Sequence, residues 1–306
     1  ICPMMRASPA VPDRAVSPLQ AWWLAIRPRT LPAAVAPILV GSAVAWREGG
    51  FHGPTALVAV AVALLLQIGS NLANDVLDFR RGADTADRLG PTRVTQGGLL
   101  STRQVGFATA IVLGLAMVSG LYLVWRGGWP ILLLGLAALV AAVAYTGGPA
   151  PLGYLGLGEA FVFLFFGLAV VAGSAYVQTG ALTPLALWAS VPIGAIVTAV
   201  LVVNNLRDIP TDRFAGKRTL AVRFGPNFAR AEYVTLLAVA FVSPLAMWLV
   251  GLLGPFWWLS WAALRVAFKL GIDLHLAQGR ALNPLLGQTA RLTLLFGVPF
   301  SASIVL

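Results

Sequence analysis

Long apolar runs alternate with short polar connections along almost the whole chain. A bilayer core about 30 Å thick is crossed by a helix of roughly 20 apolar residues, and nine runs reach about that length. The pattern therefore predicts an all-α, polytopic bundle of about nine transmembrane helices. The predicted spans are 23–46, 54–79, 104–125, 129–146, 156–178, 184–207, 230–252, 256–272 and 284–305.

The composition agrees with a membrane protein. Of 306 residues, 58% are hydrophobic and only 10% are charged, and the mean hydropathy is +0.84. A soluble chain of this length carries more polar surface. The single cysteine, Cys2, excludes a disulfide framework and a cysteine metal site. Residues 1–21 contain no basic region followed by an apolar core, so we expect a disordered tail instead of a signal peptide, ahead of one membrane domain at 22–306.

The distribution of charge predicts the topology. The net charge is +10, and the basic residues cluster before the first span, after the second and after the sixth. The alternate connections hold little beyond Arg47, Glu48 and Arg126. Because positive loops stay inside, we expect the N-terminus and both long polar loops in the cytoplasm and the C-terminus outside the cell membrane. The same clustering in short loops argues against nucleic-acid binding.

Two polar clusters stand at the ends of predicted spans. In SNLANDVLDFRRGADTADR (70–88), Asn71, Asp75 and Asp78 are spaced i, i+4, i+7, and Asn74 precedes Asp78 by four residues. These spacings place oxygen ligands on one side of a helix. The spacing Asn-x-x-x-Asp recurs 130 residues later as Asn204 and Asp208, again before a basic loop. The repeat suggests two related halves with a functional site where they meet.

The residue types in these clusters favour magnesium and a diphosphate. Amide and carboxylate oxygens without a nearby histidine or cysteine suit Mg²⁺. In the second cluster Asp208 and Asp212 are four residues apart, and we expect Pro210 to end the helix between them. Neighbouring basic residues such as Lys217 would bind the remaining phosphate oxygens. Either cluster alone is also consistent with a solvated helix end, but two matched clusters at membrane helix ends favour function.

Several other residues leave both interpretations open. Asp84 lies further into the first polar loop, where a solvated carboxylate is equally consistent. Arg27 precedes the first span and is also consistent with a headgroup anchor. Arg93 lies in the glycine-rich loop 90–101, which is a weak signal because loops are commonly rich in glycine. Tyr145, at the end of the fourth span, suits either an interfacial anchor or a place in the site.

Taken together, these motifs resemble those of the UbiA superfamily of intramembrane aromatic prenyltransferases. Asn74-Asp75-Val76-Leu77-Asp78 and Asp208-Ile209-Pro210-Thr211-Asp212 match the family's two aspartate-rich motifs, which face a central cavity in a nine-helix bundle. Many members carry a third aspartate four residues after the first motif. Here that position is Gly82, and Asp84 looks like the substitute. The stretches 74–101, 145–159 and 204–225 look like those of the branch that prenylates 1,4-dihydroxy-2-naphthoate.

The resemblance implies an enzyme that transfers a polyprenyl group from its diphosphate to 1,4-dihydroxy-2-naphthoate. Loss of CO₂ would then give demethylmenaquinone, an intermediate of menaquinone biosynthesis. It also implies Mg²⁺ as cofactor and a lipid bilayer as surroundings. The implied catalytic residues are Asp78, Asp208 and Tyr145, and the implied metal ligands are Asn74, Asp75, Asp78, Asp84, Asp208 and Asp212. The implied diphosphate ligands are Arg27, Arg81, Arg93, Arg207, Lys217 and Arg218, and the implied acceptor-binding residues are Asn71, Asn204 and Tyr145.

Two alternatives differ in testable ways. Another member of the superfamily would use 4-hydroxybenzoate or homogentisate as the acceptor and keep the same metal motifs. A transporter with an internal repeat would carry ionisable groups near the middle of spans in both halves. In this chain the polar clusters stand at one membrane face beside basic loops, which favours the enzyme.

Overall fold

The computed structural model describes residues 16–80, 89–144 and 152–306, and every regular element in these ranges is a helix. The all-α prediction is confirmed. The α-helices are α1 Pro18–Ile26, α2 Pro32–Arg47, α3 Gly53–Arg80, α4 Thr102–Ala144, α5 Gly158–Val162, α6 Val170–Thr179, α7 Pro184–Phe214, α8 Leu220–Phe224, α9 Pro226–Leu249, α10 Leu264–Leu276 and α11 Leu282–Val305. A π-helical turn, η3 Phe163–Ala169, joins α5 to α6, and a 3₁₀ helix, η4 Pro255–Ala263, precedes α10.

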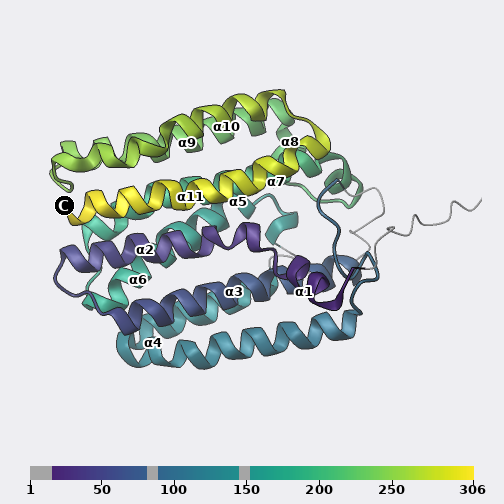
Figure 1. The fold of residues 1–306 in the computed structure, drawn as a ribbon, viewed down its shortest axis with the longest axis horizontal. Helices are drawn as coiled ribbons and strands as arrows, with labels where there is room; N and C mark the ends of the chain where they lie inside the picture. The colour runs from purple at the N-terminus through teal and green to yellow at the C-terminus, as the bar shows by residue number, and fades with distance from the viewer. Residues whose placement is uncertain (1–15, 81–88, 145–151) are drawn as a thin grey trace, which may run out of the picture.

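The long helices run side by side as one bundle, with α3 and α4 along one edge and α9 and α10 along the other (Figure 1). The short helices α1 and α8 lie at one end of the bundle, and the C-terminus lies at the opposite end. Of the long apolar helices, α7 is the most buried: 78% of its most apolar 18-residue segment is buried inside the bundle. Its small residues allow close neighbours: Gly194 meets Gly167 of η3, where an added Cβ would lie 2.6 Å from the Gly194 Cα. The helix that carries the second polar cluster is therefore fixed on several sides.

The chain is a multi-pass membrane protein. In the described ranges five helical stretches are long and apolar enough to cross a bilayer, or six when the pair on either side of a 46° bend at residues 30–32 is one span. Within the described residues, each of the nine predicted ranges falls mainly on helical residues, and α4 carries the predicted span 104–125 and the described part of 129–146. With 43 residues, α4 would extend about 64 Å, and it breaks at Gly128, whose φ of 67° is not helical. A count of nine spans is not confirmed and stays a prediction.

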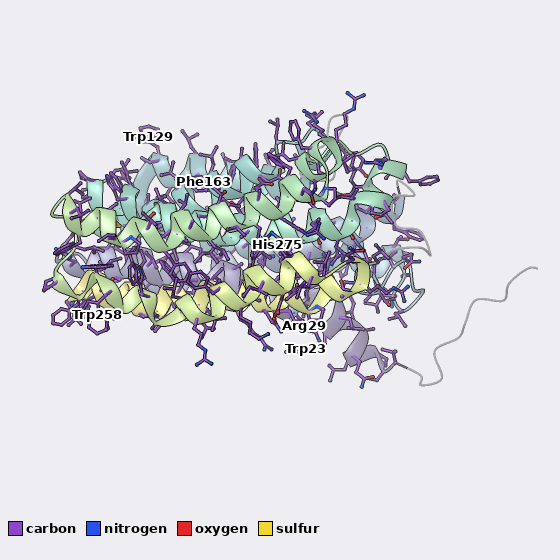
Figure 2. The ribbon with its side chains drawn as sticks, turned by 90° about the horizontal axis from the view of Figure 1, so that it is seen from above. Trp23, Arg29, Trp129, Phe163, Trp258 and His275 are labelled. Atoms are coloured by element: carbon purple, nitrogen blue, oxygen red, sulfur yellow. The ribbon has the colours of Figure 1, made fainter. Side chains whose placement is uncertain are left out.

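Exposed tryptophans mark the ends of the bundle. Trp129 and Trp258 lie toward one end, and Trp23 with Arg29 lies toward the other (Figure 2). Tryptophan is enriched where a membrane protein crosses the interface between lipid and water. Other exposed tryptophans also stand at helix ends or breaks, namely Trp46, Trp125, Trp188 and Trp248. Their positions agree with helices that cross the bilayer from one interface to the other.

Two local expectations differ from the structure. Pro210 does not end its helix, because α7 continues to Phe214. A membrane helix tolerates a proline, which removes one backbone N–H donor, when packing against neighbouring helices and local adjustment compensate for the lost bond. The proposed boundary between tail and domain at residues 21 and 22 falls inside α1, where Ala21 is buried. Residues 1–15 lie outside the described ranges.

Candidate functional site

A cavity of about 250 Å³ brings the two polar clusters together. It lies among α2, α3, α7 and the loops at the α1–α8 end of the bundle. Its apolar wall comes from residues such as Val162, Phe166 and Leu201. Its polar lining comes from Arg27, Thr30, Gln67, Ser70, Asn71, Asn74, Asp78, Arg93, Tyr154, Asn204, Asn205, Asp208, Thr211, Asp212, Lys217 and Thr219. The cavity thus joins a charged mouth to an apolar interior.

On α3, Asn74 and Asp78 face this cavity from one side of the helix. Asp78 is only 2% exposed and forms an ion pair with Arg93, whose Nη2 lies 2.6 Å from Oδ2. Arg93 also donates to the Asn74 carbonyl. The second oxygen of Asp78, Oδ1, is buried and has no hydrogen-bond partner. Since an unsatisfied buried carboxylate oxygen is costly, this atom is a natural point for a cationic ligand.

Asp75 occupies a different face of α3. It is 2% exposed and does not line the cavity. Its two oxygens accept the backbone N–H groups of Val94 at 3.2 Å and Thr95 at 3.0 Å. The structure therefore separates Asp75 from Asn74 and Asp78, with which the sequence groups it.

On α7, Arg207 holds Asp208 from behind the cavity. Its Nε and Nη2 donate to the two carboxylate oxygens at 2.7 and 2.6 Å, and Nη2 also donates to Asn204 Oδ1 at 2.7 Å. Its Nη1 donates to Asn283 Oδ1 at 3.0 Å. Arg207 is buried and does not line the cavity. Although the sequence suggested a diphosphate ligand, its guanidinium is placed to orient Asp208 and Asn204.

Lys217 follows α7 and lies over the same cavity. Its Nζ lies 3.3 Å from Asp212 Oδ1 and 5.1 Å from the centre of the Tyr154 ring. Burial and the charge of Arg93 lower the pKa of Lys217, but the charges of Asp78, Asp212 and Tyr154 together raise it by more, so the pKa lies above its usual value. Lys217 therefore stays a cation at neutral pH, at the mouth where an anion would enter.

Three asparagines complete the polar wall. Asn71 donates to the Ile26 carbonyl at 3.0 Å and to Thr30 Oγ1 at 3.3 Å, so it ties α3 to the segment before α2. Asn204 is held by Arg207. Asn205 donates to Glu159 Oε1 at 2.7 Å. These three asparagine side chains line the cavity, and each is held in place by a hydrogen bond to a neighbouring residue.

Of the remaining predicted residues that the structure describes, one lines the cavity. This residue, Arg27, has φ of 55°, the one positive value among non-glycine residues in the described ranges; such backbone strain is common at functional sites. Arg218 is exposed and does not line the cavity, although its backbone N–H donates to the Tyr154 carbonyl at 2.9 Å. Arg81, Asp84 and Tyr145 lie outside the described residues.

Sequence reasoning missed four contributors to the site. Tyr154 and Glu159 belong to the informative stretch 145–159, so their sequence context was a usable signal. Asn205 follows Asn204 directly, but only packing shows which side of α7 it faces. Asn283 carried no signal, because it reaches the site through Arg207 and through the Leu89 carbonyl, to which it donates at 2.9 Å.

The donor set fits Mg²⁺ held jointly with a phosphate ligand. In the described ranges no three acidic, histidine or cysteine side chains form a ready-made metal cage. Mg²⁺ is commonly held by one or two carboxylates together with substrate phosphates, and here the donors are carboxylate and amide oxygens. The partnerless Oδ1 of Asp78 provides one open position.

Two apolar cavities continue from the polar one. The first, of about 130 Å³, shares Gln67, Ser70, Val162 and Phe166 with it. The second, of about 170 Å³, shares Ala63, Leu66, Ala138, Phe165 and Val170 with the first. The three spaces follow α3 between α4 and the π-helical turn η3, and π-helical turns are frequent at functional sites. The apolar spaces therefore lie next to one another along α3, beginning beside the polar cavity.

The comparisons with known proteins identify the family. The UbiA prenyltransferase family model matches residues 34–282. The chain belongs to the UbiA prenyltransferase family. It is 39% identical to the 1,4-dihydroxy-2-naphthoate octaprenyltransferase of Escherichia coli, over 96% of this chain and 98% of that protein.

Solved structures of UbiA homologues share the fold. The one from Aeropyrum pernix K1 has a TM-score of 0.69 at 20% identity and covers 88% of this chain and 96% of its own. The one from Archaeoglobus fulgidus, bound to DMAPP and Mg²⁺, has a TM-score of 0.66 at 17% identity and covers 93% of this chain and 99% of its own. The helical bundle seen here is therefore the fold of this family.

Proposed function

We propose that this UbiA-family protein transfers a polyprenyl group from an allylic diphosphate to 1,4-dihydroxy-2-naphthoate, with loss of CO₂ and diphosphate, and forms demethylmenaquinol, the reduced form of demethylmenaquinone. The observation that carries the proposal is the single cavity lined by both Asn-x-x-x-Asp clusters, by three cationic side chains and by an apolar wall. The near full-length similarity to a 1,4-dihydroxy-2-naphthoate octaprenyltransferase supports this acceptor.

The carboxylates and amides of the two clusters are the proposed metal site. Asn74 and Asp78 come from α3, and Asp208 and Asp212 come from α7. Mg²⁺ bound there with the substrate would neutralise diphosphate charge and so help the diphosphate to leave. Arg207 keeps both oxygens of Asp208 in a fixed orientation. The charged groups are therefore already oriented before the reaction, and no free energy is needed to reorient them during it.

Cationic side chains at the mouth are the proposed diphosphate ligands. Arg93, Lys217 and Arg27 line the cavity, whereas Arg207 and Arg218 do not. Each guanidinium or ammonium group donates charge-assisted hydrogen bonds to phosphate oxygens. These groups stabilise the charge that develops on the departing diphosphate.

The apolar spaces along α3 are the proposed path of the prenyl tail. They begin where Gln67 and Ser70 meet the polar cavity and continue past Ala63. Their apolar walls exclude water, which would otherwise capture an allylic cation. The electron-rich ring of the acceptor then attacks the allylic carbon, and loss of CO₂ and a proton restores the aromatic ring. The catalytic and acceptor-binding roles of Tyr145 stay predictions.

The charge distribution supports a cytoplasmic active-site mouth. The ends of α3 and α7 that precede the basic loops lie with the α1 segment at one end of the bundle, and the C-terminus lies at the other (Figure 1). By the positive-inside rule, the basic end would lie in the cytoplasm. The water-soluble ends of both substrates would then enter from the cytoplasm, while the product leaves into the lipid.

An acceptor assay tests the proposal. The purified protein in lipid nanodiscs receives a prenyl diphosphate, Mg²⁺ and one of three acceptors: 1,4-dihydroxy-2-naphthoate, 4-hydroxybenzoate or homogentisate. Mass spectrometry of the lipid extract should show demethylmenaquinol, or the demethylmenaquinone that air oxidation forms from it, with the first acceptor and at most traces of product with the others. Preferential prenylation of 4-hydroxybenzoate or homogentisate would reject this acceptor assignment while leaving the family assignment intact.

A further inference from the structure

Asp75 belongs to the acidic motif by sequence, but its contacts point away from the cavity. Asp75 is turned by about 100° from Asn74 and by about 60° from Asp78, so helix geometry alone leaves its direction open and its contacts decide. The side chain is 2% exposed and lines none of the cavity. Both of its oxygens accept backbone N–H groups, from Val94 and Thr95. A metal ligand needs an oxygen directed at the metal, and Asp75 directs neither oxygen at this site.

The segment that Asp75 binds is a folded loop. Val94 and Leu100 are buried against Ala21 and Ala25 of α1 and against Val76 of α3. A tight turn closes the loop, with Leu99 N–H donating to the Val94 carbonyl at 2.9 Å. The turn passes through Gly98, whose φ is 67°, a conformation that favours glycine. The loop lies at the same end of the bundle as α1 and α8 (Figure 1). The two bonds to Asp75 therefore fasten a defined structure to α3.

The residue just before these two amides is Arg93. Its Nη2 lies 2.6 Å from Asp78 Oδ2 on the cavity side, and Nη1 donates to the Asn74 carbonyl. Asp75 and Asp78 thus hold neighbouring residues of one loop from two faces of one helix. Fixing Val94 and Thr95 also fixes the point from which the Arg93 side chain extends. Because arginine has many rotamers, such anchoring reduces the entropy lost when its guanidinium binds an anion.

We propose that Asp75 is a positioning residue that anchors the 89–101 loop and so places Arg93 at the diphosphate mouth, and that it is not a metal ligand. The inference rests on the proposed function for the identity of the anion. It assigns the two acidic residues of the first motif to different tasks: Asp78 faces the metal and Asp75 builds the loop that carries a cation. A carboxylate is required at position 75 because it alone accepts from both amides without offering a competing N–H.

Hydrogen exchange in the substrate-free, metal-free protein tests the anchor directly. In Asp75→Asn one backbone N–H faces an amide NH₂ group instead of an oxygen. The amides of Val94 and Thr95 should exchange about tenfold faster or more, as for the loss of one hydrogen bond to a charged group. Asp78→Asn keeps the Asp75 contacts and should retain this protection. Asp273→Asn on α10, whose partner is the exposed Lys269, is the remote control and should behave as wild type.

Steady-state kinetics then separate a positioning role from a metal-binding role. Asp75→Asn should raise KM for the prenyl diphosphate about tenfold, with the Mg²⁺ concentration for half-maximal rate within about twofold of wild type. Asp78→Asn should lose the Mg²⁺ response. Unchanged exchange at Val94 and Thr95 in Asp75→Asn, or a large rise in its Mg²⁺ requirement, would overturn the proposal.

Arg93→Gln keeps the inference testable if Asp75→Asn folds poorly. This variant should retain the slow hydrogen exchange of the Val94 and Thr95 amides and yet raise KM for the prenyl diphosphate as Asp75→Asn does. The double variant should be no worse than Arg93→Gln alone, since loop position matters through Arg93. If the rise in KM in the double variant equals the product of the rises in the two single variants, the proposal is contradicted. The exchange measurement involves no acceptor, so failure of the acceptor assignment leaves it unaffected.

Discussion

Asn205 donates a 2.7 Å hydrogen bond to Glu159, and of these two buried residues only Asn205 lines the cavity. Because the amide nitrogen is directed at the carboxylate, the amide carbonyl is left as an acceptor for a hydroxyl group in the cavity. Glu159→Gln can donate as well as accept, so the orientation of Asn205 is no longer enforced. We expect about a tenfold rise in KM for the dihydroxy acceptor, the equivalent of one hydrogen bond, and an unchanged KM for the prenyl diphosphate.

The matched control for this prediction is Glu48→Gln, an exposed residue at the end of α2, which should leave both constants unchanged. Initial rates with each substrate varied in turn provide the measurement. A rise in the diphosphate KM alone would show that Glu159 does not act on the acceptor side.

Arg207→Lys should impair turnover although the charge is kept. Lysine cannot reproduce the paired bonds to both oxygens of Asp208 or the additional bonds to Asn204 and Asn283. Losing about 3 kcal/mol from such a network corresponds to roughly a hundredfold fall in kcat/KM. The measurement is kcat/KM at saturating Mg²⁺, with a thermal-unfolding scan as the check on folding. A well-folded Lys variant with wild-type kcat/KM would contradict the positioning role of Arg207.

Ala63→Phe should shorten the prenyl chains that the enzyme accepts. Ala63 lines both apolar cavities along α3, and a phenyl ring there blocks the passage between them. We expect longer prenyl diphosphates to lose at least tenfold in kcat/KM, corresponding to about 1.4 kcal/mol, while dimethylallyl diphosphate is used as before. Ala61→Phe is the control, because Ala61 lies exposed on the same helix and lines neither cavity. Equal losses for short and long donors would count against this path.

The sequence was sufficient for features that depend on local pattern. Apolar runs predicted the helices, and the shared spacing of Asn74 with Asp78 and of Asn204 with Asp208 predicted that two helix ends contribute to one site. The spacing of Asn71, Asp75 and Asp78 was ambiguous, because residues at i+4 and i+7 share a face only approximately. Packing of the 89–101 loop separates Asp75 from the others, and no helical pattern encodes that loop.

Other parts of the site depend on contacts between distant residues. Arg207 is surrounded by carboxylate and amide oxygens from its own helix and from Asn283, 76 residues away, so its inward placement could not be foreseen from a basic loop. Pro210 was expected to end α7, yet the helix continues to Phe214, because its packing inside the bundle stabilises it beyond the proline. In both cases the surroundings outweigh the local preference.

In the proposed mechanism both helix ends, one on α3 and one on α7, hold the metal and the diphosphate together. The most direct measurement is Mg²⁺-dependent formation of prenylated product by Asp78→Ala and by Asp208→Ala, each shown by size-exclusion chromatography and circular dichroism to be a folded bundle. We expect both variants to lose about a thousandfold or more of turnover, as for removal of a major electrostatic contribution. Near-normal turnover in either folded variant would contradict the account.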